Sequence, residues 1–457
     1  MSTVFIGCGA GFADERPDAC IPVVETLARR DGPRYLMFET LGERTLALAQ
    51  LQRREDPDAG YTPQTAAFLR PILRTCRDAG IRIIANFGAA NPLAAGRVVI
   101  ALAEELSLDG LRVAVVRGDD LLEYVPEGTI RSWSIIEGIP FTGEPIIAAN
   151  AYLGAGPIRE ALQRSADVVI LGRGADSALA LGPLIHEFGW ADDDWDRLAA
   201  GTLVGHLLEC SAQVSGGYYA DPDYKDVPDL ARVGFPIAEV AADGTAVITK
   251  ADATGGLVSA RTVKEQILYE MHDPSAYLVP DVTLDITGVQ IADVAPDRVM
   301  VTGARGRPRP PTLKVTISAE SGWLAEGEMT YAGPNSLARA ELAADVLRER
   351  LRIVGLDCPV RIDIIGTLST FDSDSGELRR LGGLAPDGDH RVRLAGQAPD
   401  RATAQRMANE VIGLYSTGPG GGGGARRAVT NRVRTTSALV DRSLVRTEVV
   451  LLEAGAR

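Results

Sequence analysis

Short apolar segments alternate with segments of helical periodicity along roughly the first 170 residues of the chain. Each apolar segment has the length of a buried strand and is followed by small or polar residues. Between these segments, apolar residues recur at positions i, i+3, i+4 and i+7, as from Leu69 to Cys76. The six apolar segments are residues 4–6, 35–38, 81–85, 112–116, 145–149 and 167–171. The alternation predicts an α/β fold with a mostly parallel, doubly wound sheet.

The pattern changes in the second half of the chain. Residues 174–280 are expected to form a helical and loop-rich extension, and strand-like segments from residue 281 onward predict an α+β domain. The helices expected here are residues 179–188, 195–208, 337–351 and 401–415. We therefore expect two domains, residues 1–280 and 281–457, with a glycine-rich loop at 418–424 in the second.

Composition narrows the class of protein. With 46% hydrophobic residues in 457, the chain can bury a large core, and its formal net charge of −14 disfavours nucleic-acid or membrane binding. The five cysteines show no Cys-x-x-Cys spacing, so neither a disulfide framework nor a structural zinc site is expected. No apolar run approaches the ~18 residues of a membrane helix. These features predict a cytoplasmic protein.

Small and polar residues follow the six predicted strands. In an open parallel sheet, ligands bind at the carboxyl ends of the strands, so these residues predict a binding cleft. The expected binding residues are Gly9, Gly11, Glu39, Asn86, Asn91, Asp119, Asn150, Arg173 and Asp176. Asn91-Pro92 also predicts the start of a helix, with Asn91 as its N-cap.

No nucleotide motif is present. The loop at residues 7–11 follows G-x-G-x-G rather than the dinucleotide-binding G-x-G-x-x-G, and the chain contains no G-x-x-x-x-G-K-[ST] phosphate loop. A tight turn that admits an anion to a helix N-terminus is the better interpretation. No cofactor is predicted.

His206, Glu209, Cys210 and Gln213 are spaced for one face of a helix. Three interpretations stay open: acid–base chemistry, a metal site, or a helix face satisfied by its own hydrogen bonds. The metal site is the weakest, because no second group of ligands is present, and we expect no metal. Gly216 and Gly217 follow directly and would let the backbone approach a ligand.

Lys250 is one of only four lysines among 47 basic residues. Beside a turn that contains Gly255 and Gly256, its ammonium could stabilise a carboxylate, phosphate or enolate; the alternative is an exposed hairpin lysine.

The run of five glycines at residues 420–424 precedes Arg426 and Arg427. Consecutive glycine amides can bind an anion, so we expect an ordered turn at the cleft between the two domains, with Gly421, Gly422, Gly423 and Arg426 as binding residues. A flexible linker is the alternative.

Several of these segments together resemble the acyclic terpene utilisation (AtuA-like) family, a domain of unknown function. The resemblance covers nearly the whole chain and includes Gly118-Asp119-Asp120, Asn150-Ala-Tyr152, Gly205-His206 and Pro310-Pro311-Thr-Leu-Lys314. It implies a context of terpene degradation through CoA thioesters. Longer members carry an extra small C-terminal domain, which leaves room for a separate small companion subunit.

The residues favour an enzyme that acts by cofactor-independent acid–base chemistry, of hydratase/dehydratase, isomerase or lyase type. Its substrate would be a small anionic or thioester acyl compound, with CoA present only as part of the substrate. We expect Glu209 or Asp120 as base, His206 as acid and Lys250 as carbonyl stabiliser. The alternative is a non-catalytic binding or scaffolding subunit of an acyl-CoA-processing complex. A homo-oligomer is expected.

Overall fold

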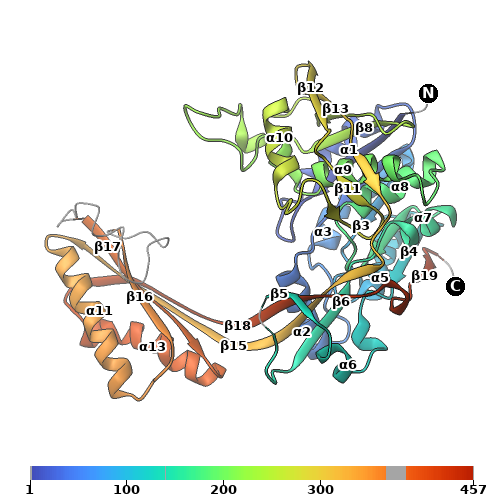
Figure 1. Ribbon diagram of the computed structural model, residues 1–457. Helices are drawn as coiled ribbons and strands as arrows, with labels where there is room; N and C mark the ends of the chain where they lie inside the picture. Colours follow the sequence, from blue (N-terminus) through green and yellow to red (C-terminus); the bar gives the residue numbers. More distant parts are fainter. Residues whose placement is uncertain (1–2, 139, 367–387, 456–457) are drawn as a thin grey trace. The chain divides into compact units, whose positions relative to one another are not determined.

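The computed structural model describes residues 3–138, 140–366 and 388–455 (Figure 1). Its contacts divide the chain into two compact units. Unit 1 comprises Met1–Thr142, Ile146–Ser318 and Thr435–Arg457, and unit 2 comprises Gly143–Pro145 and Ala319–Arg434. Unit 2 is therefore an insertion within unit 1. None of the helices in the described ranges has the length and apolar character needed to cross a membrane.

Unit 1 is built on a 10-stranded mixed sheet, with strand order β12-β13-β9-β8-β1-β2-β3-β7-β4-β19. Its parallel centre consists of β1 (Thr3–Ala10), β2 (Arg34–Phe38), β3 (Ile81–Ala85), β7 (Val168–Leu171) and β4 (Arg112–Arg117). The antiparallel flanks are β8 (Pro236–Ala241), β9 (Ala246–Lys250), β13 (Arg298–Thr302), β12 (Gln290–Ala295) and β19 (Glu448–Glu453).

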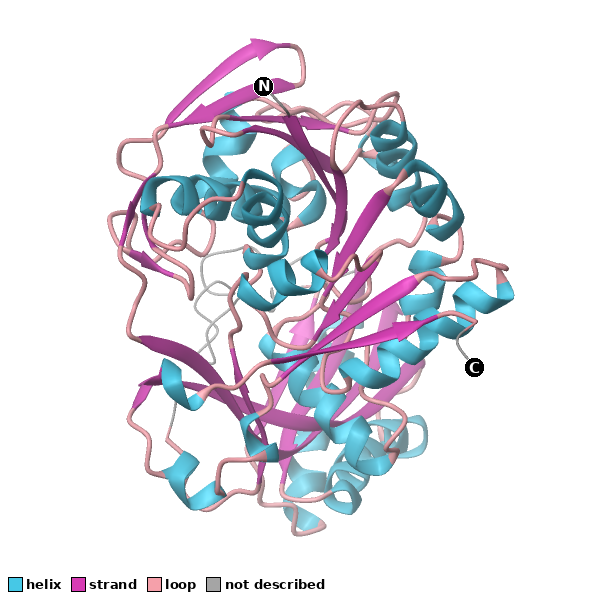
Figure 2. Ribbon diagram, turned by 90° about the vertical axis from the view of Figure 1, so that its right-hand side faces the viewer, coloured by secondary structure: helices cyan, strands magenta, loops and turns pink. Residues whose placement is uncertain are grey.

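Hydrophobic clusters cover both faces of this sheet. Neighbouring residues of one strand point to opposite faces, so Ile83 packs into one cluster and Ile84 into the other. The first cluster contains residues of α1 (Cys20–Ala28), α4 (Leu73–Ala79) and α5 (Pro92–Glu105). The second contains residues of α7 (Gly156–Gln163), α8 (Ala178–Phe188) and α9 (Trp195–Leu208). Figure 2 shows helices on either side of the strands.

Shorter elements complete unit 1. A 3-stranded sheet has the order β10-β11-β14. These strands are β10 (Tyr277–Leu278), β11 (Thr283–Asp285) and β14 (Arg305–Arg307). The remaining helices are α2 (Glu43–Glu55), α3 (Thr65–Leu69), α6 (Glu127–Arg131), α10 (Ala260–Leu268) and the 3₁₀ turns η1 (Leu121–Glu123), η2 (Ser211–Ser215), η3 (Leu230–Arg232) and η4 (Arg442–Leu444).

The described elements of unit 2 follow the order of a ferredoxin-like β-α-β-β-α-β arrangement. They are the part of β15 (Thr312–Gly333) from Ala319 onward, α11 (Ser336–Ile353), β16 (Val360–Ile365), β17 (Gly388–Ala398), α13 (Arg401–Thr417) and the part of β18 (Gly422–Asp441) up to Arg434. The sheet order is β16-β17-β15-β18, continued by β5 (Ile135–Glu137). Apolar residues of α11 and α13 pack on one face, where Met329 and Val392 are fully buried.

Most predicted elements are confirmed, but their assembly differs from the expectation. The strand expected at 145–149, β6 (Ile146–Ala151), pairs with β15 and does not join the 10-stranded sheet, which is mixed rather than mostly parallel. The expected domain boundary near residue 280 does not coincide with the division after Ser318. The C-terminal strand β19 also belongs to unit 1, because its backbone pairs with β4. Periodicity shows which face of a strand is buried, but not which strand lies beside it.

Asn91 caps α5, as the sequence predicts. Its side chain accepts a hydrogen bond from Ala94 N and donates to the carbonyl oxygens of Pro57 and Ala59. We expect Asn91→Ala to lower the free energy of unfolding by about 1–3 kcal/mol, because the cap and both donors are lost. Asn91→Asp keeps the accepting oxygen, so its free energy of unfolding should lie between those of the native chain and of Asn91→Ala. Urea denaturation measures the difference, and equal values for Ala and Asp would contradict the capping role.

Candidate active site

The parallel strands of unit 1 bring polar residues to one edge of the sheet. Glu39 follows β2, Asn86 follows β3, Asp119 follows β4 and Arg173 follows β7. Because these strands are parallel, their carboxyl ends lie on the same side. The sequence analysis predicted this position for all four side chains from the fact that each follows a strand.

The first pair at this edge joins β2 to β3. The amide of Asn86 donates to Glu39 Oε1 at 2.7 Å, and its Oδ1 accepts from Thr40 N at 2.7 Å. Burial raises the pKa of Glu39, while the charge of Arg173 and the hydrogen bonds from Leu41 N and Asn86 work against that rise. The carboxyl group therefore holds its proton to higher pH than an exposed glutamate.

A second group of hydrogen bonds joins the end of β4 to β7 and to β6. Asp119 Oδ2 accepts hydrogen bonds from Asn150 Nδ2 and from Arg173 N, both at 2.8 Å. A β-carbon on Gly172 would lie 2.6 Å from the same oxygen, so this approach requires glycine. Burial raises the pKa of Asp119 to about 7. Although β6 lies outside the large sheet, an isolated bridge between Asp120 and Asn150 keeps it at this edge.

Arg173 is the central cation of the site and is 1% exposed. Its guanidinium donates to Leu41 O and to the Asp176 carboxylate, and its Cζ lies 4.2 Å from the ring centroid of Tyr152. Its Nε has no hydrogen-bond partner among the described residues. A buried guanidinium requires such carboxylate neighbours, since an unpaired buried charge is strongly destabilising.

Tyr152 links this cation to the more exposed rim. Its hydroxyl donates to Glu43 Oε1 at 2.5 Å, and Lys314 Nζ lies 5.3 Å from its ring centroid. Burial works against the charge of Glu43, but the hydrogen bond from Tyr152 and the charge of Arg173 hold its pKa below the ordinary value. Glu43 is therefore a stable anion at neutral pH.

His206 and Glu209 form a buried pair at the end of α9. Their Nδ1 and Oε1 atoms are 2.7 Å apart, and His206 Nε2 lies 2.9 Å from Gln266 O. A carbonyl oxygen only accepts, so Nε2 carries a hydrogen, and a short contact at Nδ1 requires a second proton between His206 and Glu209. Burial opposes the charge on His206, but Glu209 raises its pKa above the ordinary value.

Glu209 also connects this pair to Arg173 and its carboxylates. Its charge raises the pKa values of Glu39 and Asp176, after the larger effect of burial. For Asp176, the charge of Arg173 opposes this rise, and the pKa still lies well above the ordinary value. We call the group the edge cluster; it consists of Glu39, Glu43, Tyr152, Arg173, Asp176 and Glu209.

A family model described as "Acyclic terpene utilisation family protein AtuA" matches residues 4–451. The chain belongs to the acyclic terpene utilisation family. Neither the curated proteins nor the solved structures contain a significant match. The resemblance inferred from the sequence motifs is thus confirmed, and the name places this AtuA family chain in the context of acyclic terpene utilisation.

Two residues expected to be catalytic have other partners in this AtuA family chain. Lys250 Nζ donates to Thr254 O at 2.9 Å and lies 3.4 Å from Asp297 Oδ2. Asp120 accepts from Gln50 Nε2 at 2.9 Å, with Arg53 at 3.5 Å. No contact joins Lys250 to the edge cluster within the described ranges. Burial raises the pKa of Asp120, which is compatible with its expected role as a base. The contacts of Lys250 do not support its expected role as a carbonyl stabiliser.

The expected single helix face from His206 to Gln213 is wrong. α9 ends at Leu208, Glu209 is its C-cap and Gln213 lies in η2, a 3₁₀ turn. Glu209 and Cys210 follow α9 directly and stay near His206. Gln213 lies in the 3₁₀ turn and therefore does not continue the helical face of α9. Burial raises the pKa of Cys210, so its thiol stays protonated at neutral pH.

The glycines expected to admit a ligand instead approach protein atoms. A β-carbon on Gly9 would meet the Phe38 ring at 2.5 Å, and one on Gly11 would meet Ser211 N at 2.5 Å. The same holds for Gly216, Gly217, Gly255 and Gly256, which face Val227, Ala212, Asp229 and Ser215 respectively. Their small size thus allows these segments to pack closely against one another.

The glycine run is only in part the expected turn. Gly421 and Gly424 have positive φ, +82° and +62°, whereas the residues from Gly422 onward belong to the strand β18. The Gly420 carbonyl accepts from Arg339, and Arg426 is exposed. These residues differ from a free turn because β15 offers β18 a backbone partner.

The sequence interpretation missed four residues around the site. Tyr152, Lys314 and Glu43 form its rim, and the ring of Tyr277 lies 6.3 Å from that of His206. The rarity of lysine was a signal for Lys314, and the Asn150-Ala-Tyr152 motif was one for Tyr152. Glu43 and Tyr277 carry no comparable signal.

Asp119 gives the site a measurable pH dependence. Its pKa is about 7 in the folded chain against an ordinary value of 3.8, so the folded chain binds this proton more tightly. The carboxyl group therefore stabilises the fold below about pH 4, and that contribution is lost as the pH rises through about 7. We expect the free energy of unfolding of Asp119→Asn, relative to the native chain, to increase across this window. Urea denaturation at several pH values measures it, and a constant difference would refute the assignment.

Proposed function

We propose that this chain is an enzyme that performs cofactor-independent acid–base chemistry on a carboxylated or CoA-thioester acyl substrate. The reaction would be of hydratase/dehydratase, isomerase or lyase type. The observation that carries the proposal is the edge cluster, in which Glu39 and Asp176 have raised pKa values beside the buried cation Arg173. The family context supports an acyl substrate, since the family is named for acyclic terpene utilisation.

Carboxyl groups with raised pKa values suit proton transfer near neutral pH. A group is most effective as acid or base when its pKa lies near the working pH. Burial raises the pKa of Glu39 and of Asp176, the charge of Glu209 adds to both rises, and the charge of Glu39 adds to the rise in Asp176. Such perturbed groups concentrate at functional sites. In this proposal, Asp176, with a side chain about one-third exposed, gives or takes the proton that the substrate exchanges.

Glu209 is our choice for the base that removes a proton next to the substrate carbonyl. His206 then acts through Glu209, because both ring nitrogens are already hydrogen-bonded within the protein. We therefore replace the expected role of His206 as direct acid by that of a positioning residue. When the C–H bond breaks, its electron pair moves to the carbonyl oxygen, and Arg173 provides the cation nearest to the carboxylates. In a dehydration, the β-hydroxyl would leave as water with a proton from Asp176.

The test measures proton abstraction without knowledge of the net reaction. The purified chain is incubated in D₂O with a panel of saturated, 2-enoyl and 3-hydroxyacyl CoA thioesters and free branched acids, and deuterium at the α-carbon is followed by mass spectrometry. We expect exchange with at least one probe. Glu209→Gln should slow it by about 10²–10⁴-fold, the usual contribution of a general base.

The matched control is Glu25→Gln, an exposed residue of α1, which should exchange at the native rate. His206→Gln, which keeps polar atoms at the ring position, should lower the rate and shift its pH profile if His206 positions Glu209. Absence of exchange with every probe would support a non-catalytic subunit instead. Full exchange in Glu209→Gln would remove Glu209 from the mechanism.

A further inference from the structure

The first half of β18 is an edge strand of unit 2. It pairs with β15 on one side, whereas on its other side β5 begins pairing only at Ser437 and Ala438. Within the described ranges, no strand is assigned to the outer side of residues 422–432. Ala425 N instead donates to the hydroxyl of Tyr415 on α13 at 3.4 Å. Such an edge presents backbone donors and acceptors that a further strand can use.

A hollow lies beside this edge. Gln405 and Asn409 of α13 and residues 427–429 of β18 enclose about 340 Å³. Arg427 donates to Asn409 across it. Tyr415, the residue that meets Ala425, is 60% exposed. The edge therefore combines free backbone groups with a helix-walled hollow for side chains.

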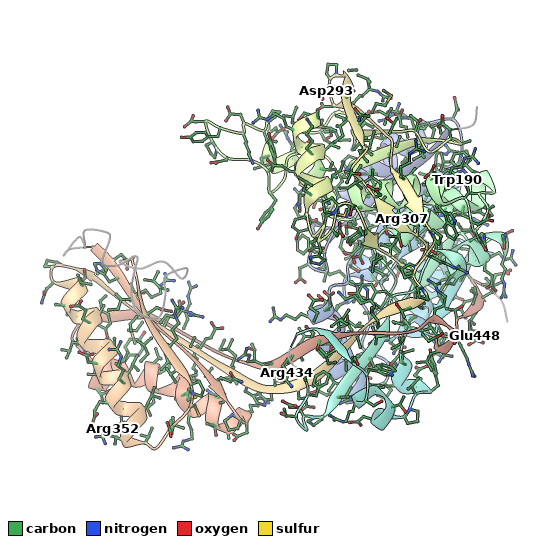
Figure 3. The ribbon with its side chains drawn as sticks, viewed as in Figure 1. Trp190, Asp293, Arg307, Arg352, Arg434 and Glu448 are labelled. Atoms are coloured by element: carbon green, nitrogen blue, oxygen red, sulfur yellow. The ribbon has the colours of Figure 1, made fainter. Side chains whose placement is uncertain are left out.

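The edge is also basic in an acidic protein. Residues 422–440 contain Arg426, Arg427, Arg432 and Arg434 and no acidic residue, although the chain carries a net charge of −14. Arg434, labelled in Figure 3, pairs with Glu144 at 2.8 Å. Arg426 and Arg432 are exposed, and neither has an ion pair among the described residues. Both occupy even positions of the strand, so they share one face of the sheet.

We propose that the outer edge of β18 binds an acidic peptide segment of a partner protein in extended conformation. The segment would add a strand beside residues 422–432 through backbone hydrogen bonds, as in β-augmentation. Arg426 and Arg432 are six residues apart, or roughly 20 Å along a strand, so acidic residues six positions apart would meet both. This binding is independent of the acid–base chemistry of unit 1.

Nucleic acid fits this edge less well. The face that carries Arg426 and Arg432 holds alanine and threonine between them and no aromatic residue for base stacking. The overall negative charge also repels a phosphate backbone. A peptide with carboxylates on alternate residues satisfies both the charge and the free backbone groups.

The test uses fluorescence anisotropy with the full chain and a labelled ten-residue peptide of alternating Glu and Thr. We expect saturable binding that weakens with salt. The double variant Arg426→Glu, Arg432→Glu should weaken binding at least tenfold. The matched control is Arg348→Glu, Arg352→Glu on α11, where Figure 3 labels Arg352 and both arginines pair within their own helix; its affinity should stay within twofold. Circular dichroism confirms that each variant is folded.

Further probes separate strand addition from simple charge attraction. A peptide of alternating Glu and Pro has the same charge but cannot form a regular strand, and it should bind at least tenfold more weakly. No binding of the Glu-Thr peptide would mean that the arginines only protect the edge from pairing. Equal binding of the Glu-Pro peptide, or tighter binding of a single-stranded oligonucleotide of the same charge, would also overturn the proposal.

Discussion

The candidate site depends on one buried charge, the guanidinium of Arg173. A fully buried cation is stable only with close anionic and hydrogen-bonding partners. Leu41, Asp176 and the ring of Tyr152 supply these contacts from three separate parts of the chain. The requirement to surround this charge thus brings the loop after β2, the loop after β7 and the end of β6 together. The carboxylates gathered for this purpose are also the groups that can exchange protons.

A second constraint acts on the backbone that carries Arg173. Its amide nitrogen is held by Asp119, which leaves no room for a side chain at Gly172. The same carboxylate binds Asn150, so the ends of β4, β6 and β7 share one acceptor. Removal of any of these contacts would leave a buried polar group without a partner, which costs more than the hydrogen bond contributes. The position of Arg173 is therefore set from both its side chain and its backbone.

Unit 2 differs from unit 1 in where its charged residues lie. Its helices cover one face of the sheet, while the opposite face carries cross-strand ion pairs such as Arg393 with Glu326 at 2.6 Å. Its edge strand carries positive charge, in contrast to the carboxylates of the edge cluster in unit 1. The family match spans residues of both units. The proposed acid–base chemistry lies in unit 1, and the proposed peptide binding lies in unit 2.

The sequence by itself determined the local features. The apolar segments predicted the strands, the spacing of Asn91 and Pro92 predicted the cap of α5, and the polar residues after the strands predicted one functional edge. These features depend on neighbouring residues, which is why periodicity and capping chemistry reveal them. Three contacts are visible only in the folded chain: the pairing of β19 with β4, the stacking of Tyr152 on Arg173 and the ion pair of Lys250 with Asp297. Each of those outcomes joins residues far apart in the chain, and long-range packing rather than local pattern selects the partner.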